Sequence, residues 1–332
     1  MNLILSIIYP IFAVGIDYCD KTNLNTVMKK LALIIVTLAV LGSCKKTEEP
    51  APAPVPEPKQ ELVPIQIATA VTRATDYAFE TGDDVGLFVV NQPSDLQTSG
   101  NHVDNCRFTF DGTKWNAGEE TYWLDATTKA DFYCYYPYTS SVSSITAFPF
   151  QVCQDQSSES GYKASDLMWG KVDGVSPTPD PVVISVNHSM SCLIVKLKAG
   201  TGWKEDDIKD AEVTLCGLRT SSLINLADGT VTADGGATEM KPMKVGTGIF
   251  KALVVPQKVS DSDLVQVKVG TNSYSLKTSI DLKSGCTRAR LLSTAPARAS
   301  TSASGLGRLT TSTTEDRLNK PMPKNAIDRF QS

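Results

Sequence analysis

The sequence predicts an all-β protein with two β-sandwich domains, and three observations support this prediction. Short runs that alternate apolar and polar residues recur from residue 62 to residue 285. Gly, Asn and Asp residues separate these runs, and no long amphipathic helical pattern lies between them. Closely spaced short strands with turn residues between them are typical of β-sandwiches.

A secretion signal precedes the strands. Lys29 and Lys30 are followed by LALIIVTLAVLGSC, an apolar run too short for a comfortable membrane-spanning helix. Its end resembles a lipobox, so residues 28–43 are interpreted as a lipoprotein signal peptide and Cys44 as the lipidated residue. The alternative is an ordinary signal peptide with a chance cysteine. Residues 1–27 are interpreted as an upstream extension from a misassigned start codon.

A proline-rich linker follows over residues 44–61. Its core, TEEPAPAPVPEPKQE, alternates proline with Ala, Val and Glu, which excludes helix and sheet. Polyproline II rises about 3.1 Å per residue, so roughly 15 residues give a spacer of about 45 Å. The linker is therefore expected to hold a folded domain away from a membrane surface.

The first sandwich is expected over residues 62–187. LVPIQIATAV alternates as a strand does, and Asp111-Gly112 in FTFDGTKWN is a strong hairpin signal. In DFYCYYPY, alternation separates two sets of side chains onto opposite faces of one strand. These sets are Phe132, Cys134 and Tyr136 on one face, and Tyr133 and Tyr135 on the other.

The second sandwich is expected over residues 188–285. The proline-rich loop VSPTPDPVV precedes the boundary, and the run CLIVKL begins a fresh set of strands. WKEDDIKDA provides one or two helical turns at most.

Composition argues against most catalytic and cofactor chemistry. The net charge of −4 provides no basic surface for nucleic acid. His102 and His188 are the only histidines, which argues against a histidine-based triad or zinc site. No nucleotide-binding loop occurs, and the acidic pairs and triplets do not match a calcium loop. We therefore expect no enzyme, cofactor or metal site. No CxxC pair occurs, and the pairing of the cysteines stays open.

Two features are candidate sites. Aromatic residues Tyr133, Tyr135 and Trp169 are candidate contacts for a sugar ligand, with core packing as the alternative. Arg73 and Ala74 form an Arg–Ala bond in a polar run after the first predicted strand. A trypsin-like protease would cut such a bond, although an ordinary exposed arginine is the alternative.

An ordered set of motifs extends over about residues 62–285. The motifs are FETGDDVGLFV, FDGTKWN, the YW of TYWLD, DFYCYYPY, DQS, DLMWG, VNHSMSCLIVKLKAG, VVPQ and LKSG. Together they resemble the fimbrillin family of Bacteroidetes surface lipoproteins.

The resemblance implies a subunit of fimbriae with two transthyretin-like (Greek-key) β-sandwich domains, anchored through lipid at the cell outer membrane. It also implies that a protease cuts after an arginine near the first strand, which here matches Arg73. Loss of that strand opens a groove that a strand of another subunit fills, and such head-to-tail pairing gives a filament.

The partners implied are other fimbrial subunits, in a homo- or heteropolymer, the processing protease and a host or bacterial surface receptor. The alternative is a monomeric surface lipoprotein that binds a glycan or host protein. A protein with either function would be exposed at the cell surface.

The final segment, residues 286–332, departs from the strand pattern. It is rich in Ala, Ser, Thr and Arg and lacks alternation, so it is expected to be disordered and to leave the second sandwich truncated. Reading its codons one base out of frame permits alternating strands and a stop codon. We therefore hypothesise a single-base frameshift between Ser284 and Thr287, which the nucleotide sequence around codon 285 tests.

Overall fold

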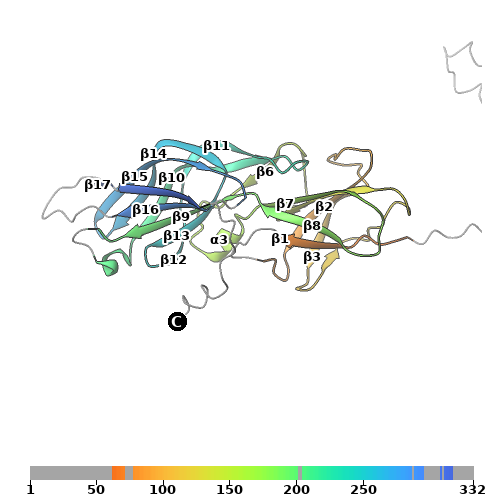
Figure 1. Ribbon diagram of the computed structural model, residues 1–332, viewed down its shortest axis with the longest axis horizontal. Coiled ribbons are helices and arrows are strands. Elements are labelled where there is room, and N and C mark those ends of the chain that lie inside the picture. Colours follow the sequence, from red (N-terminus) through yellow and green to blue (C-terminus); the bar gives the residue numbers. More distant parts are fainter. Residues whose placement is uncertain are drawn as a thin grey trace, which may run out of the picture. The chain divides into compact units, whose positions relative to one another are not determined.

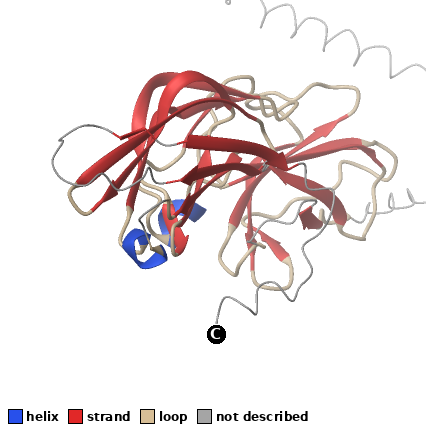
Figure 2. Cartoon of the chain, turned by 60° about the vertical axis from the view of Figure 1, so that its left-hand side comes forward, coloured by secondary structure: helices blue, strands red, loops and turns tan. Residues whose placement is uncertain are grey.

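The computed structural model describes residues 62–71, 78–200, 204–285, 288–294, 307–308 and 310–316. The chain divides into two units, residues 1–59 and 60–332, and every described residue lies in the second. Figure 2 shows strands throughout this part, with helix confined to short segments. The all-β class predicted from the sequence is confirmed. None of the helices within the described ranges is long and apolar enough to cross a membrane.

The first half forms one seven-stranded sheet. Its order across the sheet is β1-β8-β7-β5-β2-β3-β4. The strands are β1 (Ile67–Val71), β2 (Asp84–Asn91), β3 (Val103–Phe110), β4 (Trp115–Ala117), β5 (Ala130–Tyr136), β7 (Met168–Val175) and β8 (Val182–His188). The predicted hairpin at Asp111-Gly112 is confirmed, since β3 and β4 pair antiparallel on either side of it.

This sheet curves around its own core. Buried apolar side chains from every one of its strands form a single cluster, together with Ile65 and Trp123. The two edge strands are joined by one side-chain bond, in which the indole N–H of Trp115 in β4 donates to Oγ1 of Thr69 in β1 at 3.1 Å. The layered arrangement of the first half is therefore made by one curved sheet whose edges meet.

The second half is built from two sheets (Figure 1). One has the order β11-β10-β14-β15-β17, with β6 also paired to β10, and the other has the order β12-β13-β9-β16-β18. Their strands are β6 (Phe148–Gln151), β9 (Ser191–Lys198), β10 (Glu212–Ile224), β11 (Val231–Met240), β12 (Met243–Gly246), β13 (Ile249–Val254), β14 (Gln257–Val269), β15 (Asn272–Leu282), β16 (Arg288–Thr294), β17 (Gly307–Arg308) and β18 (Thr310–Asp316). Two short helical segments are α3 (Glu159–Lys163) and η1 (Glu205–Ile208).

Sheet membership changes between β8 and β9, close to the boundary expected at residues 187 and 188. One segment departs from that simple division. Strand β6 precedes β7 in sequence, yet it pairs antiparallel with β10 of the second half, from Phe148 opposite Ile224 to Gln151 opposite Ser221. The second core therefore draws residues from both sides of the expected boundary.

Strand β5 shows how the two cores are related. Its alternation is as predicted, because Phe132, Cys134 and Tyr136 belong to the first core. Tyr133 and Tyr135 on the opposite face belong to the second core, which extends to Leu282. Both faces of β5 are therefore buried.

The prediction that residues 286–332 are disordered is wrong for the part of this segment that the structure describes. Strand β16 pairs parallel with β9, and β18 pairs antiparallel with β16. Without β16, one edge of β9 would present unpaired N–H and C=O groups, and strand addition satisfies them through backbone atoms alone. A segment with a poor side-chain pattern can therefore extend the sheet beyond residue 285.

Candidate functional site

Strand β1 lies at an edge of the first sheet and ends two residues before Arg73. It pairs parallel with β8, from Ile67 opposite Val182 to Val71 opposite Val186. We call the place filled by residues 62–71, along β8 and beside residues 121–123, the β1 seat. Arg73, Ala74 and Cys44 lie outside the described residues.

Two isoleucines fix the segment to the core. Ile65 and Ile67 are each only 4% exposed and contact the first core. Burial of an isoleucine side chain stabilises by roughly 1.5–3 kcal/mol. Gln66 between them points outward and donates from its amide to the carbonyl of Pro179 at 3.2 Å. The alternation that predicted a strand therefore also divides the segment into a core face and an outer face.

Backbone bonds hold the segment on both sides. On one side, the amide N–H of Val182 donates to the Gln66 carbonyl at 2.8 Å. On the other, the N–H of Ile65 donates to the Thr121 carbonyl and the N–H of Trp123 donates to the Val63 carbonyl, both at 2.9 Å. An extended chain that left the seat would expose backbone groups on both walls, and another extended chain could satisfy them.

Trp115 contacts the chain on both sides of the candidate cleavage bond. Before that bond, Thr69 accepts its indole N–H. After it, the Phe79 ring packs edge-on against Trp115, with the ring centroids 5.0 Å apart. The Trp115 side chain itself is buried.

Lys163 holds the chain that follows the candidate bond. Its ammonium lies 2.6 Å from Oε2 of Glu80 and 3.0 Å from Oδ1 of Asp83. The hydroxyl of Tyr136 also donates to Asp83, at 3.3 Å. Burial lowers the pKa of Lys163, but the hydrogen bonds to Glu80 and Asp83 outweigh it and raise that pKa above its ordinary value. Burial raises the pKa of Tyr136 to about 12. The lysine is thus charged and the tyrosine neutral at physiological pH.

Of the aromatic residues proposed as ligand contacts, Tyr133 and Tyr135 are core residues, so that prediction is wrong for these two. Tyr135 is 1% exposed and Tyr133 is 6% exposed. Trp169 packs against the second core, and its indole N–H donates to the Leu226 carbonyl at 2.8 Å. Alternation along β5 correctly separated two faces, but it could not show that the second face is covered by the second half of the chain.

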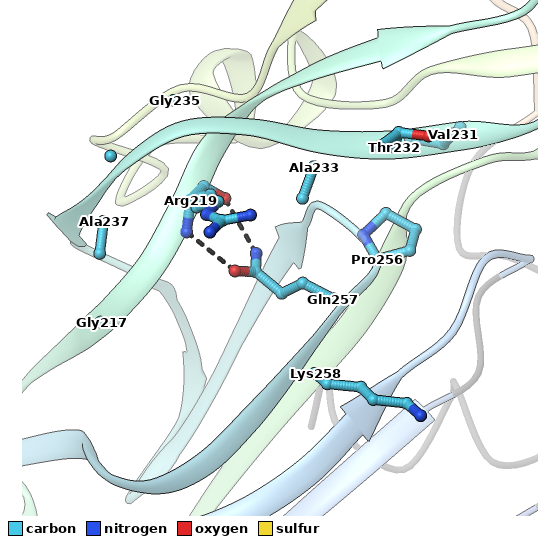
Figure 3. A pocket seen from close by; sticks show the side chains of 11 residues that line it. Gly217, Arg219, Val231, Thr232, Ala233, Gly235, Ala237, Pro256, Gln257 and Lys258 are labelled. Carbon is cyan, nitrogen blue, oxygen red and sulfur yellow. Dashed lines mark hydrogen bonds between the residues drawn. The ribbon is translucent and has the colours of Figure 1, made fainter.

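Two glutamines, from the motifs DQS and VVPQ, form side-chain hydrogen bonds with the backbone of distant strands. Gln156 of DQS is fully buried, and its side-chain amide donates to the Leu253 carbonyl at 2.7 Å while accepting the Leu253 N–H at 2.8 Å. Gln257 of VVPQ makes the same pair of bonds to Arg219, at 3.0 Å each (Figure 3). Each side chain thus takes the place of a neighbouring strand at one residue of an edge.

Two further motifs meet in a buried side-chain contact. Nδ1 of His188, from VNHSMS, lies 2.7 Å from Oδ1 of Asp166, from DLMWG. Both side chains are buried, at the end of β8 and just before β7. The sequence does not predict this contact, because a pair of residues 22 positions apart leaves no local pattern.

A polar pocket of about 660 Å³ lies over β10, β11 and the start of β14. Figure 3 shows Gln257 pointing from β14 toward Arg219, with Ala233 and Ala237 of β11 beside them. Gly217 and Gly235 lie in the wall with φ of 71° and 72°, a left-handed backbone that favours glycine. The wall contains no aromatic side chain.

The cysteines Cys106, Cys134, Cys153 and Cys216 are free thiols. Complete burial raises the pKa of Cys134 to about 12, as expected for an inert core residue. Within the described ranges, no three His, Cys, Asp or Glu side chains are grouped so that they could hold a metal ion.

Comparisons with known proteins give a consistent picture. The model of a family described as fimbrillin-like matches residues 72–296. A Bacteroides uniformis protein, provisionally named a fimbrium subunit, is 28% identical over 241 residues, which cover 69% of this chain and 72% of that protein. A Bacteroides ovatus protein, provisionally named a fimbrium tip subunit, is 27% identical over 193 residues; the match spans 51% of this chain and 35% of that longer protein.

Two crystal structures, both described as provisionally assigned cell adhesion proteins, share the fold. The Bacteroides uniformis structure has a TM-score of 0.59 at 21% identity, covering 76% of this chain and 98% of the other. The Bacteroides ovatus structure has a TM-score of 0.62 at 19% identity, covering 76% and 96%.

Proposed function

The chain belongs to the fimbrillin-like family, and we propose on that basis that it is a structural and adhesive subunit of surface fimbriae. In this proposal, Cys44 carries the lipid that holds the protein at the cell outer membrane, exposed on the surface. A protease cuts after Arg73, the first strand leaves, and a strand of another fimbrial subunit takes its place. The names of the relatives from Bacteroides uniformis and Bacteroides ovatus support a fimbrial role.

The single observation that supports strand release best is the position of β1. It is an edge strand held by two buried isoleucines and a few backbone bonds, and it ends at Val71, two residues before the candidate bond. Residues after that bond have separate attachments, through Phe79 to Trp115 and through Glu80 to Lys163. A cut after Arg73 would therefore free the segment before it and leave the rest of the sheet attached.

Treatment of the purified full chain with an arginine-specific protease tests the proposal. We expect a new N-terminus at Ala74, followed by oligomers that increase stepwise in mass and require exchange of the first strand. A chain that is cut at this bond and stays monomeric, also when mixed with uncut chain, would contradict polymerisation by strand exchange.

The alternative of a monomeric glycan-binding lipoprotein has lost its main support. Tyr133 and Tyr135 are buried and Trp169 packs against the second core, so they form no exposed platform. A receptor at the host or bacterial surface remains part of the proposed adhesive role.

The Lys163 attachment yields a prediction about the cut chain. Lys163→Met is expected to lower the free energy of unfolding by about 1 kcal/mol, since its two ion pairs are partly exposed to water. It should also loosen residues 78–83, so that a protease trims the cut chain beyond Ala74. Urea unfolding and mass spectrometry of the trimmed ends measure the two effects.

Lys171→Met provides the matched control, because Lys171 pairs with Asp173 in its own strand at 2.7 Å. It removes an ion pair of similar length and exposure, and the other contact of Lys171 is with the Tyr133 ring of the neighbouring strand β5 rather than with residues 78–83. Equal trimming of both variants would show that Lys163 does not hold the new end.

A further inference from the structure

On the core face of the β1 seat, one polar group needs a hydrogen-bond partner from the strand that fills the seat. Thr69 points inward in line with Ile65 and Ile67, and it is the side chain that accepts the indole N–H of buried Trp115. This bond also joins the two edges of the curved sheet. Removal of residues 62–71 therefore takes away the acceptor of Trp115 as well as the apolar side chains of Ile65 and Ile67 and the partly buried ones of Val63 and Val71.

The replacement of that acceptor determines which strand fits. A buried donor left without a partner costs much of its desolvation energy, whereas a hydroxyl oxygen at the same place restores the bond. Valine has nearly the shape of threonine but cannot accept the N–H. An incoming strand with valine there would bury more apolar surface and still bind less tightly.

We propose that Trp115 selects the strand that refills the β1 seat, by requiring threonine or serine at the position that Thr69 now fills. The occupant is an extended segment of another fimbrial subunit. It places apolar side chains where Ile65 and Ile67 lie and a hydroxyl two residues further on. This inference rests on the proposed function, since it concerns the strand that replaces β1.

Peptides that copy residues 62–71 test the inference against the full chain after cleavage by an arginine-specific protease. Fluorescence anisotropy of labelled peptides gives the dissociation constant for the native peptide and for its Thr69→Ser and Thr69→Val forms. We expect the native and serine peptides to bind within about threefold of each other. The valine peptide should bind about 10-fold more weakly, which corresponds to about 1.4 kcal/mol.

Two controls separate the hydrogen bond from apolar contact. Ala70→Val in the peptide adds the same kind of side chain on the outer face and should change binding less than about twofold. Trp115→Phe in the protein removes the donor, so its preference for threonine over valine should disappear or reverse.

The outcomes distinguish selection by Trp115 from strand exchange itself. Equal or tighter binding of the valine peptide to the wild-type cut chain would overturn the inference while leaving strand exchange intact. No exchange of any peptide into the cut chain would contradict the proposed function, and the inference with it. A preference for threonine that persists in Trp115→Phe would assign the selection to a different residue and overturn the inference.

Discussion

Replacing Arg73 with lysine is expected to abolish assembly while leaving the fold intact. An arginine-specific protease recognises the planar guanidinium through bonds that an ammonium cannot reproduce, so cleavage at residue 73 should fall by about 100-fold or more. The uncut chain keeps β1 in its seat and should remain a monomer. Mass spectrometry of the N-terminus and size-exclusion chromatography with light scattering measure the two effects.

Arg219→Lys is the matched control for this variant. Arg219 is an exposed arginine in β10, far in sequence from the candidate bond. The control should be cut at residue 73 and should assemble as the wild type does. Normal assembly of Arg73→Lys under the same protease would show that release of the first strand does not depend on this bond.

Replacing Gln156 with alanine is expected to lower the free energy of unfolding by about 3–5 kcal/mol. The fully buried amide makes three bonds, two to Leu253 and one to the Cys153 carbonyl at 3.1 Å. Alanine leaves buried backbone groups without partners and opens a cavity in the core. The midpoint of urea unfolding measures the loss.

Gln257→Ala separates the effect of burial on stability from the effect of the backbone hydrogen bonds. Gln257 makes the same two backbone bonds, to Arg219, but lies half-buried beside the open pocket. Water can replace its amide there, so the expected loss is about 1 kcal/mol. Similar losses for the two variants would mean that burial of the Gln156 amide is not what makes it important.

The sequence predicted the strands well because alternation is a local property. The two faces of β5 were assigned correctly, and the first predicted strand lies where LVPIQIATAV placed it. What covers a face is not local. Tyr133 and Tyr135 were therefore proposed as ligand contacts although the second core buries them.

The candidate site was predicted only in outline for the same reason. The position of Arg73 after an alternating strand follows from the sequence, but the bond from Trp115 to Thr69 spans 46 residues. The bonds of Gln156 to Leu253 span 97 residues, and no spacing within DQS or VVPQ predicts them. For residues 286–332, the sequence predicted disorder where the structure has strands. Strand β16 pairs with β9 through backbone groups that any residue except proline provides, so a side-chain pattern is not needed.

In the proposed assembly, β1 must leave its seat before subunits can join, and a reversible lock on β1 tests this requirement. Ala68 and Val183 are register partners on β1 and β8, and Val183 is exposed. Neighbouring strands lie about 4.8 Å apart, within the range of roughly 4.4–6.8 Å that a disulfide spans between Cα atoms. The double variant Ala68→Cys, Val183→Cys should therefore close a disulfide when oxidised, whereas each single variant should not.

The measurement is the mass distribution of this double variant after cleavage at Arg73, with and without a reducing agent. We expect the oxidised chain to be cut and to stay monomeric, and we expect reduction to restore oligomers to the level of the two single variants. Oligomers formed equally well by the oxidised, fully cut chain would show that subunits join while β1 remains in place, and strand exchange at the β1 seat would then be excluded.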